Sequence, residues 1–100
     1  MTNTTDNKFA AHDGACRRAM ICEATAELIE TASGYLRDAT DSLAAPGADR
    51  ELLEIGDDIA LALNSLQTCL RTLVMKRDAE IAFRDACEID WNYAANKEQP

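Results

Sequence analysis

The chain has 100 residues, which is enough for one small domain with a limited core. Apolar residues make up 47% of it, which excludes a disordered chain, and the net charge of −8 argues against direct nucleic-acid binding. No apolar run approaches the roughly 18 residues of a membrane span, and the polar start MTNTTDNK is not a signal peptide. We therefore expect a single cytoplasmic domain over residues 1–100, without membrane partners.

The first long helix is predicted over about residues 15–44. Residues 1–7 are polar and are expected to form a flexible tail, and His12-Asp13-Gly14 is expected to interrupt the chain before the helix. Small and apolar residues then recur at alternating steps of four and three, as on one face of a helix. This row comprises Ala15, Ala19, Cys22, Ala26, Ile29, Ser33, Leu36, Thr40 and Leu43. An adjacent row comprises Ile21, Leu28, Ala32, Tyr35 and Ala39.

A reversal is predicted at residues 45–49, followed by a second helix over about 49–75. Pro46-Gly47 ends the first helix, and Asp49 is a candidate cap for the second. Because the connection is short, the two helices must lie antiparallel. Pairing them about the turn places Cys22 opposite Cys69. The same pairing places Ile29 opposite Ala62 and Leu36 opposite Ile55.

Two alternatives stay open for the residues after position 75. Lys76-Arg77-Asp78 breaks the apolar rhythm, so a kink or a separate third helix over about 79–94 is one interpretation. A continuation of the second helix is the other. Residues 96–100 are expected to form a second flexible tail.

The second helix carries two apolar rows, and the first helix can cover only one of them. We expect it to cover the row through Ile55, Ile59, Ala62, Leu66 and Cys69. The remaining row is then too apolar for an ordinary exposed face and is predicted to bind a partner. Its residues are Leu53, Ala60, Leu63, Leu70 and Val74. A twofold partner would complete a four-helix bundle, the predicted all-α architecture.

Charge is unevenly distributed along the chain. From Glu23 to Asp58 there are ten acidic residues and two basic ones, and the remainder is balanced. In a hairpin this makes the turn end acidic and the open end basic. This polarity favours antiparallel packing of two hairpins.

No catalytic, cofactor-binding or metal site is expected. There is no glycine-rich phosphate loop and no Ser/His/Asp set. The four cysteines lack zinc-knuckle spacing, and one histidine cannot complete a Cys/His set. In a reducing compartment we expect these cysteines to be reduced core residues.

An acidic pattern gives one alternative. E23-A-T-A-E27 and E54-I-G-D57 lie in the two long helices, and carboxylates on facing helices can hold Mg²⁺. Over about residues 20–75 the pattern resembles the all-helical nucleotide pyrophosphatases of the MazG type, although Ala24 replaces one glutamate of the motif. The resemblance implies Mg²⁺-dependent hydrolysis of nucleoside triphosphates, with Glu23, Glu27, Glu54 and Asp57 as metal ligands.

The sequence favours a non-catalytic helical module that forms a homodimer or binds another protein. A second alternative is an acidic phage-type inhibitor that presents carboxylates in place of nucleic-acid phosphates. Small anti-CRISPR proteins are similar to this chain in composition. The identity of a partner cannot be read from the sequence.

Overall fold

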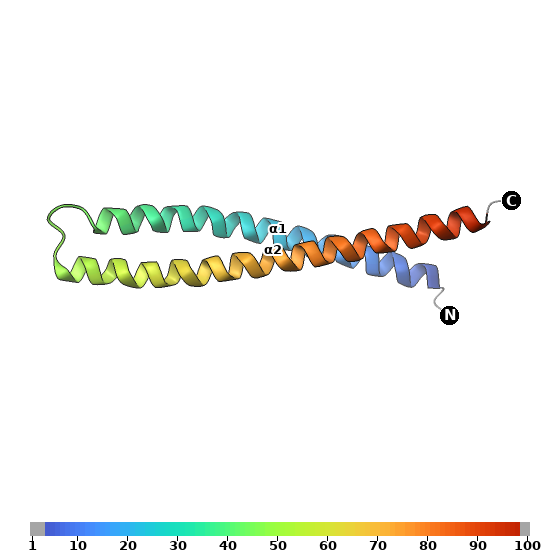
Figure 1. Cartoon of the computed structure of the whole chain (residues 1–100), viewed down its shortest axis with the longest axis horizontal. Coiled ribbons are helices and arrows are strands. Elements are labelled where there is room, and N and C mark those ends of the chain that lie inside the picture. Colours follow the sequence, from blue (N-terminus) through green and yellow to red (C-terminus); the bar gives the residue numbers. More distant parts are fainter. Residues whose placement is uncertain (1–3, 99–100) are drawn as a thin grey trace. The chain divides into compact units, whose positions relative to one another are not determined.

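The computed structural model describes residues 4–98, which form two α-helices joined by a loop (Figure 1). Helix α1 comprises Thr4–Leu43, and helix α2 comprises Arg50–Glu98. No strand occurs between residues 4 and 98, so the predicted all-α hairpin class is confirmed. Neither helix contains, over its described residues, a stretch long and apolar enough to cross a membrane.

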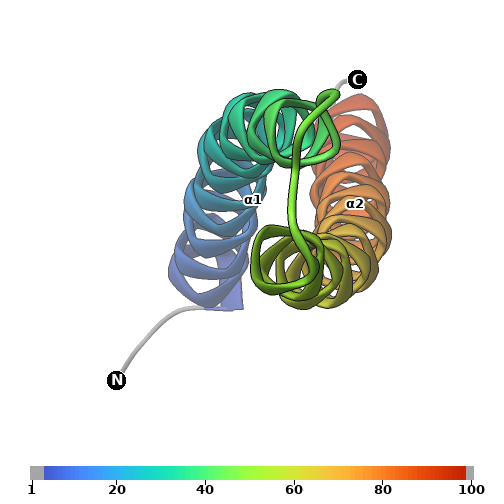
Figure 2. The same cartoon turned by 90° about the vertical axis from the view of Figure 1, so that its left-hand side faces the viewer.

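The loop between the helices lies where the sequence predicts it. Gly47 has a backbone φ of 93°, a left-handed conformation that glycine adopts without steric cost. An oxygen of the Asp49 side chain accepts a hydrogen bond of 2.9 Å from the backbone N–H of Leu52, which caps the first turn of α2. The end-on view shows the loop crossing from α1 to α2 (Figure 2). The predicted reversal and its cap are confirmed.

Helix α2 runs without a break through residues 76–78. Of the two alternatives left open, continuation of the second helix is confirmed, and a separate helix over 79–94 is not formed. No glycine or proline occurs between Gly56 and Pro100 to interrupt it. Lys76 and Glu80 form an ion pair of 3.3 Å one turn apart, a spacing that supports a helix. The charged triplet therefore changes the helix surface without ending the helix.

Helix α1 begins earlier than predicted. It runs through His12-Asp13-Gly14, where Asp13 forms an ion pair of 3.2 Å with Arg17 one turn later. The helices also include residues 4–7 and 96–98, which the sequence assigned to flexible tails. Helix α1 therefore begins before, and helix α2 ends after, the positions predicted from the sequence. The rest of those two segments, residues 1–3 and 99–100, lies outside the described residues.

The contacts divide the chain into two units. The loop unit is Ala24–Leu73, and the terminal unit combines Met1–Glu23 with Val74–Pro100. Each unit contains a segment of α1 and a segment of α2. The single domain expected over residues 1–100 stays a prediction.

In the loop unit, the row predicted for α1 faces α2. Ala26 and Ser33 are buried, and the other members of the row in this unit are half-buried. On α2 the seam takes residues from both predicted rows. Leu63 of the second row is buried, and Ile59 and Leu66 of the first row are half-buried, whereas Ile55, Ala62 and Cys69 of the first row are exposed. Gly56, which belongs to neither row, is also buried. A Cβ placed on Gly56 would lie 3.7 Å from Cβ of Leu43. The sequence had placed Leu36 at this level, so the predicted register is wrong by about two helical turns.

The terminal unit has a core of small side chains. Ala15, Ala19 and Cys22 of α1 and Cys87 of α2 are its buried apolar residues among those described. Arg18 donates a hydrogen bond of 2.8 Å to Glu80 across the two helices. Cys22 is buried here while Cys69 is exposed in the loop unit, so their predicted apposition in one seam is wrong.

The ion pair between Arg18 and Glu80 gives a pH-dependent prediction. The hydrogen bond from Arg18, assisted by Lys76, holds the pKa of Glu80 below its ordinary value of 4.5. A lowered pKa contributes stability above the unfolded-state value, and this contribution is lost as the pH falls through the folded-state value. We expect Glu80→Gln to melt at a lower temperature than the wild type at neutral pH, and the difference to shrink below pH 4.5.

Thermal melts followed by circular dichroism at neutral and acid pH measure this difference. Asp13→Asn is the control, because Asp13 pairs only with Arg17 within α1 and both side chains are exposed. A difference between wild type and Glu80→Gln that stays constant with pH would contradict the assigned role of the pair.

Candidate interaction surface

The predicted partner-binding row on α2 is spread over several environments. Leu53 is exposed and Leu63 is buried against α1. Ala60, Leu70 and Val74 are half-buried. Partner binding by this row stays a prediction, but Leu53 is its one large exposed side chain, and the other large exposed side chains described in the loop unit lie elsewhere.

One face of the loop unit carries a groove between the helices. Ser33, Glu30 and Arg37 of α1 line it together with Gln67 and Leu70 of α2. The Ser33 hydroxyl oxygen is buried and has no hydrogen-bond partner among the described residues. The same face continues towards the loop as a smaller pocket lined by Thr40, Leu43, Ala44, Leu53, Gly56 and Asp57.

Helix α1 presents apolar residues on the side away from this groove. Leu28 precedes Glu30 by two residues, and Tyr35 precedes Arg37 by two residues. Two residues correspond to about 200° around a helix, so Leu28 and Tyr35 point away from the groove. They are 71% and 72% exposed. Exposed Ala32 lies between them, which leaves an uncharged strip along α1.

Helix α2 carries apolar residues on the same side, with the exposed polar residues Asp58 and Ser65 between them. Ile55 lies two residues from both Leu53 and Asp57, which line the pocket beside the loop, so Ile55 points to the opposite side. Ala62 and Cys69 follow at steps of seven and are also exposed. In an antiparallel helix pair the sides turned away from one groove form one common face. We call it the apolar face: Leu28, Ala32, Tyr35, Ile55, Ala62 and Cys69.

The hairpin leaves most of its large apolar side chains in solvent. No large side chain among the described residues is fully buried, and the core consists mainly of alanine and cysteine. An exposed apolar surface of this extent marks a site of association more often than an ordinary solvated face.

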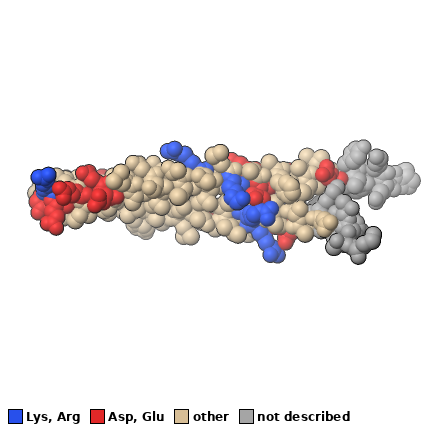
Figure 3. All heavy atoms as spheres, turned by 90° about the horizontal axis from the view of Figure 1, so that it is seen from below, with Lys and Arg blue, Asp and Glu red and all other residues tan. Residues whose placement is uncertain are grey.

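Acidic residues surround the loop. The loop unit contains nine Asp and Glu residues against three Arg residues, which gives it a net charge of −6. Figure 3 shows the acidic side chains gathered at the end of the unit that holds the loop. The apolar face runs from this acidic end towards a less charged one.

The carboxylates of the MazG-like pattern do not form a cluster in the described structure. Glu54 forms an ion pair of 3.3 Å with Arg50. Glu27 and Asp57 are exposed in the loop unit, and Glu23 is exposed in the terminal unit. No three Asp, Glu, His or Cys residues within the described part are placed to hold a metal ion.

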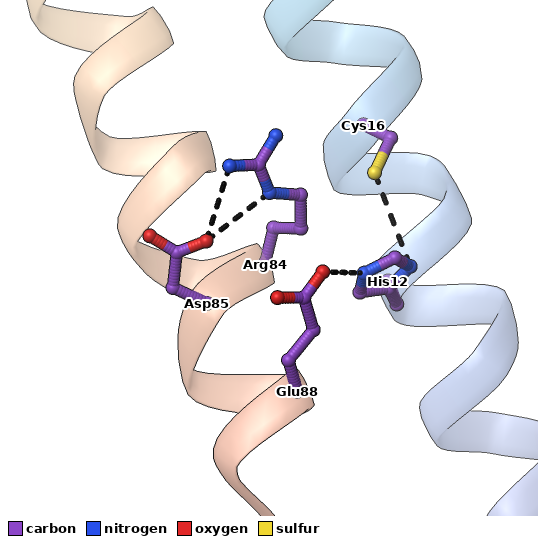
Figure 4. A network of polar contacts seen from close by, with 5 residues as sticks. All are labelled: His12, Cys16, Arg84, Asp85 and Glu88. Carbon is purple, nitrogen blue, oxygen red and sulfur yellow. Dashed lines mark hydrogen bonds and ion pairs between the residues drawn. The ribbon is translucent and has the colours of Figure 1, made fainter. Parts of the chain in front are cut away.

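The terminal unit contains a polar network that sequence reasoning missed (Figure 4). His12 Nε2 lies 2.9 Å from an oxygen of Glu88, and His12 Nδ1 lies 3.9 Å from Cys16 Sγ. Arg84 donates hydrogen bonds to Asp85 beside them. The spacing of His12 and Cys16, one helical turn, was the available signal. The spacing was not recognised because His12 was assigned to a loop before the first helix.

Comparison with known proteins adds no assignment: no family model, curated protein or solved structure matches the chain.

Proposed function

We propose that this chain is a non-catalytic helical interaction module that forms a homodimer through the apolar face. The observation that carries the proposal is the exposure of Leu28, Tyr35 and Ile55 on the side away from the groove. A hairpin of two helices buries little apolar surface by itself, and a second hairpin packed on this face supplies the missing core.

The charge distribution favours an antiparallel arrangement of the two copies. A parallel pair would bring the acidic loop ends together, whereas an antiparallel twofold pair separates them. A twofold axis that lies in the interface and runs across the helices packs α1 against α1 of the other copy and α2 against α2. Leu28 and Tyr35 would then meet the matching strip of the second copy, and aromatic and aliphatic side chains would fill the interface.

The proposal predicts that Leu28→Glu dissociates the dimer. An acidic side chain in the interface would have to be buried without a partner, which costs several kcal/mol. We expect the wild type to sediment as a dimer at micromolar concentration and the variant as a monomer. Circular dichroism should show most of the helical signal retained, because Leu28 is 71% exposed in the single chain.

Leu61→Glu is the matched control. Leu61 is 66% exposed, but it lies about 120° around α2 from Ile55 and outside the apolar face. We expect this variant to remain dimeric. A wild type that stays monomeric at every concentration would rule out the homodimer. The apolar face would then belong to a foreign protein, and the alternative of an acidic inhibitor would take precedence.

A further inference from the structure

The groove between the helices of the loop unit has the size and the mixed lining of a small-molecule site. Its volume is about 360 Å³, which falls in the range of pockets that bind small ligands. Ser33 and two charged residues line it from α1, and Gln67 and Leu70 line it from α2. The apolar face points away from this groove, so the proposed dimer leaves the groove open to solvent.

Ser33 has a buried hydroxyl that forms no hydrogen bond. The residue is 5% exposed, and its Oγ atom has no partner among the described residues. Other hydroxyls donate to the carbonyl oxygen four residues earlier in their own helix, namely those of Thr31, Thr40, Thr68 and Thr72. Burial of a hydroxyl without a partner destabilises the folded chain. A polar ligand in the groove would supply the missing partner.

Opposite charges stand at the two ends of the α1 wall of the groove. Glu30 precedes Ser33 by three residues, and Arg37 follows it by four. The Cα atoms of Glu30 and Arg37 are therefore separated by about 10 Å along the helix axis, with Ser33 between them. Neither charged side chain forms an ion pair within residues 4–98. Both can therefore bind a ligand without breaking an existing contact.

The α2 wall offers an amide and an apolar surface. Gln67 has a carbonyl oxygen and an NH2 group, so its side chain can both accept and donate hydrogen bonds. Leu70, three residues later, is half-buried and provides an apolar contact. The groove therefore matches a short molecule with an anionic end, a cationic end and an apolar chain between them.

We propose that this groove binds a free basic amino acid, lysine or arginine. The α-carboxylate pairs with the Arg37 guanidinium, which binds carboxylates through two parallel N–H groups. The cationic end of the ligand side chain pairs with the Glu30 carboxylate, and the methylene chain lies on Leu70. The Ser33 hydroxyl and the Gln67 amide oxygen accept hydrogen bonds from the α-ammonium group.

The test titrates the isotope-labelled full chain with L-lysine at low salt and follows the backbone amides by NMR. L-norleucine is the matched ligand, because it keeps the α-amino acid group and an apolar chain but lacks the terminal charge. We expect saturable shifts at the residues that line the groove. Norleucine should bind at least about tenfold more weakly, because it loses a charge-assisted hydrogen bond. Cadaverine, which lacks the carboxylate, should be weakened to a similar extent.

Variants assign each end of the ligand to one residue. Glu30→Gln should weaken lysine binding about tenfold and leave the binding of norleucine unchanged, because norleucine has no charge to pair with Glu30. Arg37→Gln should weaken the binding of both ligands. Arg50→Gln is the matched control and should bind as the wild type does, since Arg50 pairs with Glu54 and does not line the groove.

Ser33→Ala separates binding from structure. Without ligand this variant should melt at a higher temperature than the wild type, because it removes a buried hydroxyl that has no partner. It should also bind lysine more weakly. A serine with a purely structural role would show a lower melting temperature on replacement and unchanged lysine binding.

Two results would overturn the assignment. In the first, neither lysine nor arginine causes saturable shifts in the groove at millimolar concentration. In the second, Glu30→Gln and Arg37→Gln bind lysine as tightly as the wild type, which would place the binding outside the groove. Neither result bears on the homodimer, because the apolar face lies on the opposite side of the loop unit.

Discussion

Replacing Leu63 with alanine is expected to lower the free energy of unfolding by about 2–5 kcal/mol. Leu63 is 9% exposed and packs in the loop unit on the face that meets α1. Truncation removes the transfer free energy of its buried methyl groups and leaves a cavity that a helix pair can only partly close. Urea denaturation followed by circular dichroism measures the loss.

Leu61→Ala provides the matched comparison two residues away. Leu61 is exposed, so its truncation should change the free energy of unfolding by no more than about 0.5 kcal/mol. Equal losses in the two variants would contradict the arrangement of the rows on α2. A larger loss for Leu61 would mean that Leu61, and not Leu63, lies on the side of α2 that faces α1.

Substitution of two glycines by alanine should have effects of opposite sign. Gly47 has a φ of 93°, where a Cβ is strained, so Gly47→Ala should destabilise the protein by about 1–2 kcal/mol. Gly34 lies inside α1, and an added Cβ would meet nothing within 4 Å. Gly34→Ala should therefore stabilise the protein by about 0.5–1 kcal/mol.

Melting temperatures measured at one protein concentration compare the two glycine variants with the wild type. The concentration must be held constant because association would contribute to stability. A Gly47→Ala protein as stable as the wild type would show that the loop can reverse without a left-handed residue. A destabilised Gly34→Ala protein would show that this position touches a partner in the assembled protein.

Much of the fold could be predicted from local patterns. The row from Ala15 to Leu43 keeps its rhythm over the length of a helix, and the structure buries or half-buries each member of it. Pro46, Gly47 and Asp49 determine where the chain turns. The proline ring disfavours continuation of the helix, Gly47 adopts a positive φ, and Asp49 caps α2, and each of these effects is local. Such features depend on a few neighbouring residues and are visible in the sequence.

The pairing of the helices could not be predicted in the same way. Helix α2 carries two rows of similar apolar content, and the periodicity of the sequence does not show which row packs against α1. The choice depends on how side chains fit across the seam, where Gly56 accommodates Leu43. The charged triplet at Lys76-Arg77-Asp78 was misleading for a related reason. A polar stretch changes what a helix packs against, but only glycine or proline strongly disfavours its backbone.

The apolar face was visible in part, and the thiol network was not. The row containing Leu28 and Tyr35 was recognised as a second strip on the first helix, whereas Ile55 was assigned to the seam. The network joins His12 to Glu88, 76 residues apart, and depends on the true register. An error of two turns in the register hides any site of this kind.

The distances along the chain between paired residues have a consequence for how the protein folds. We expect the helices to meet first beside the loop, because few residues separate the partners there and closing the chain costs little entropy. Pairing of the two helices should then proceed outward from the loop, to contacts between residues that lie 62 and 76 positions apart in the chain. Contacts between residues so far apart in the chain are expected to form last, because closing a long loop costs the most entropy.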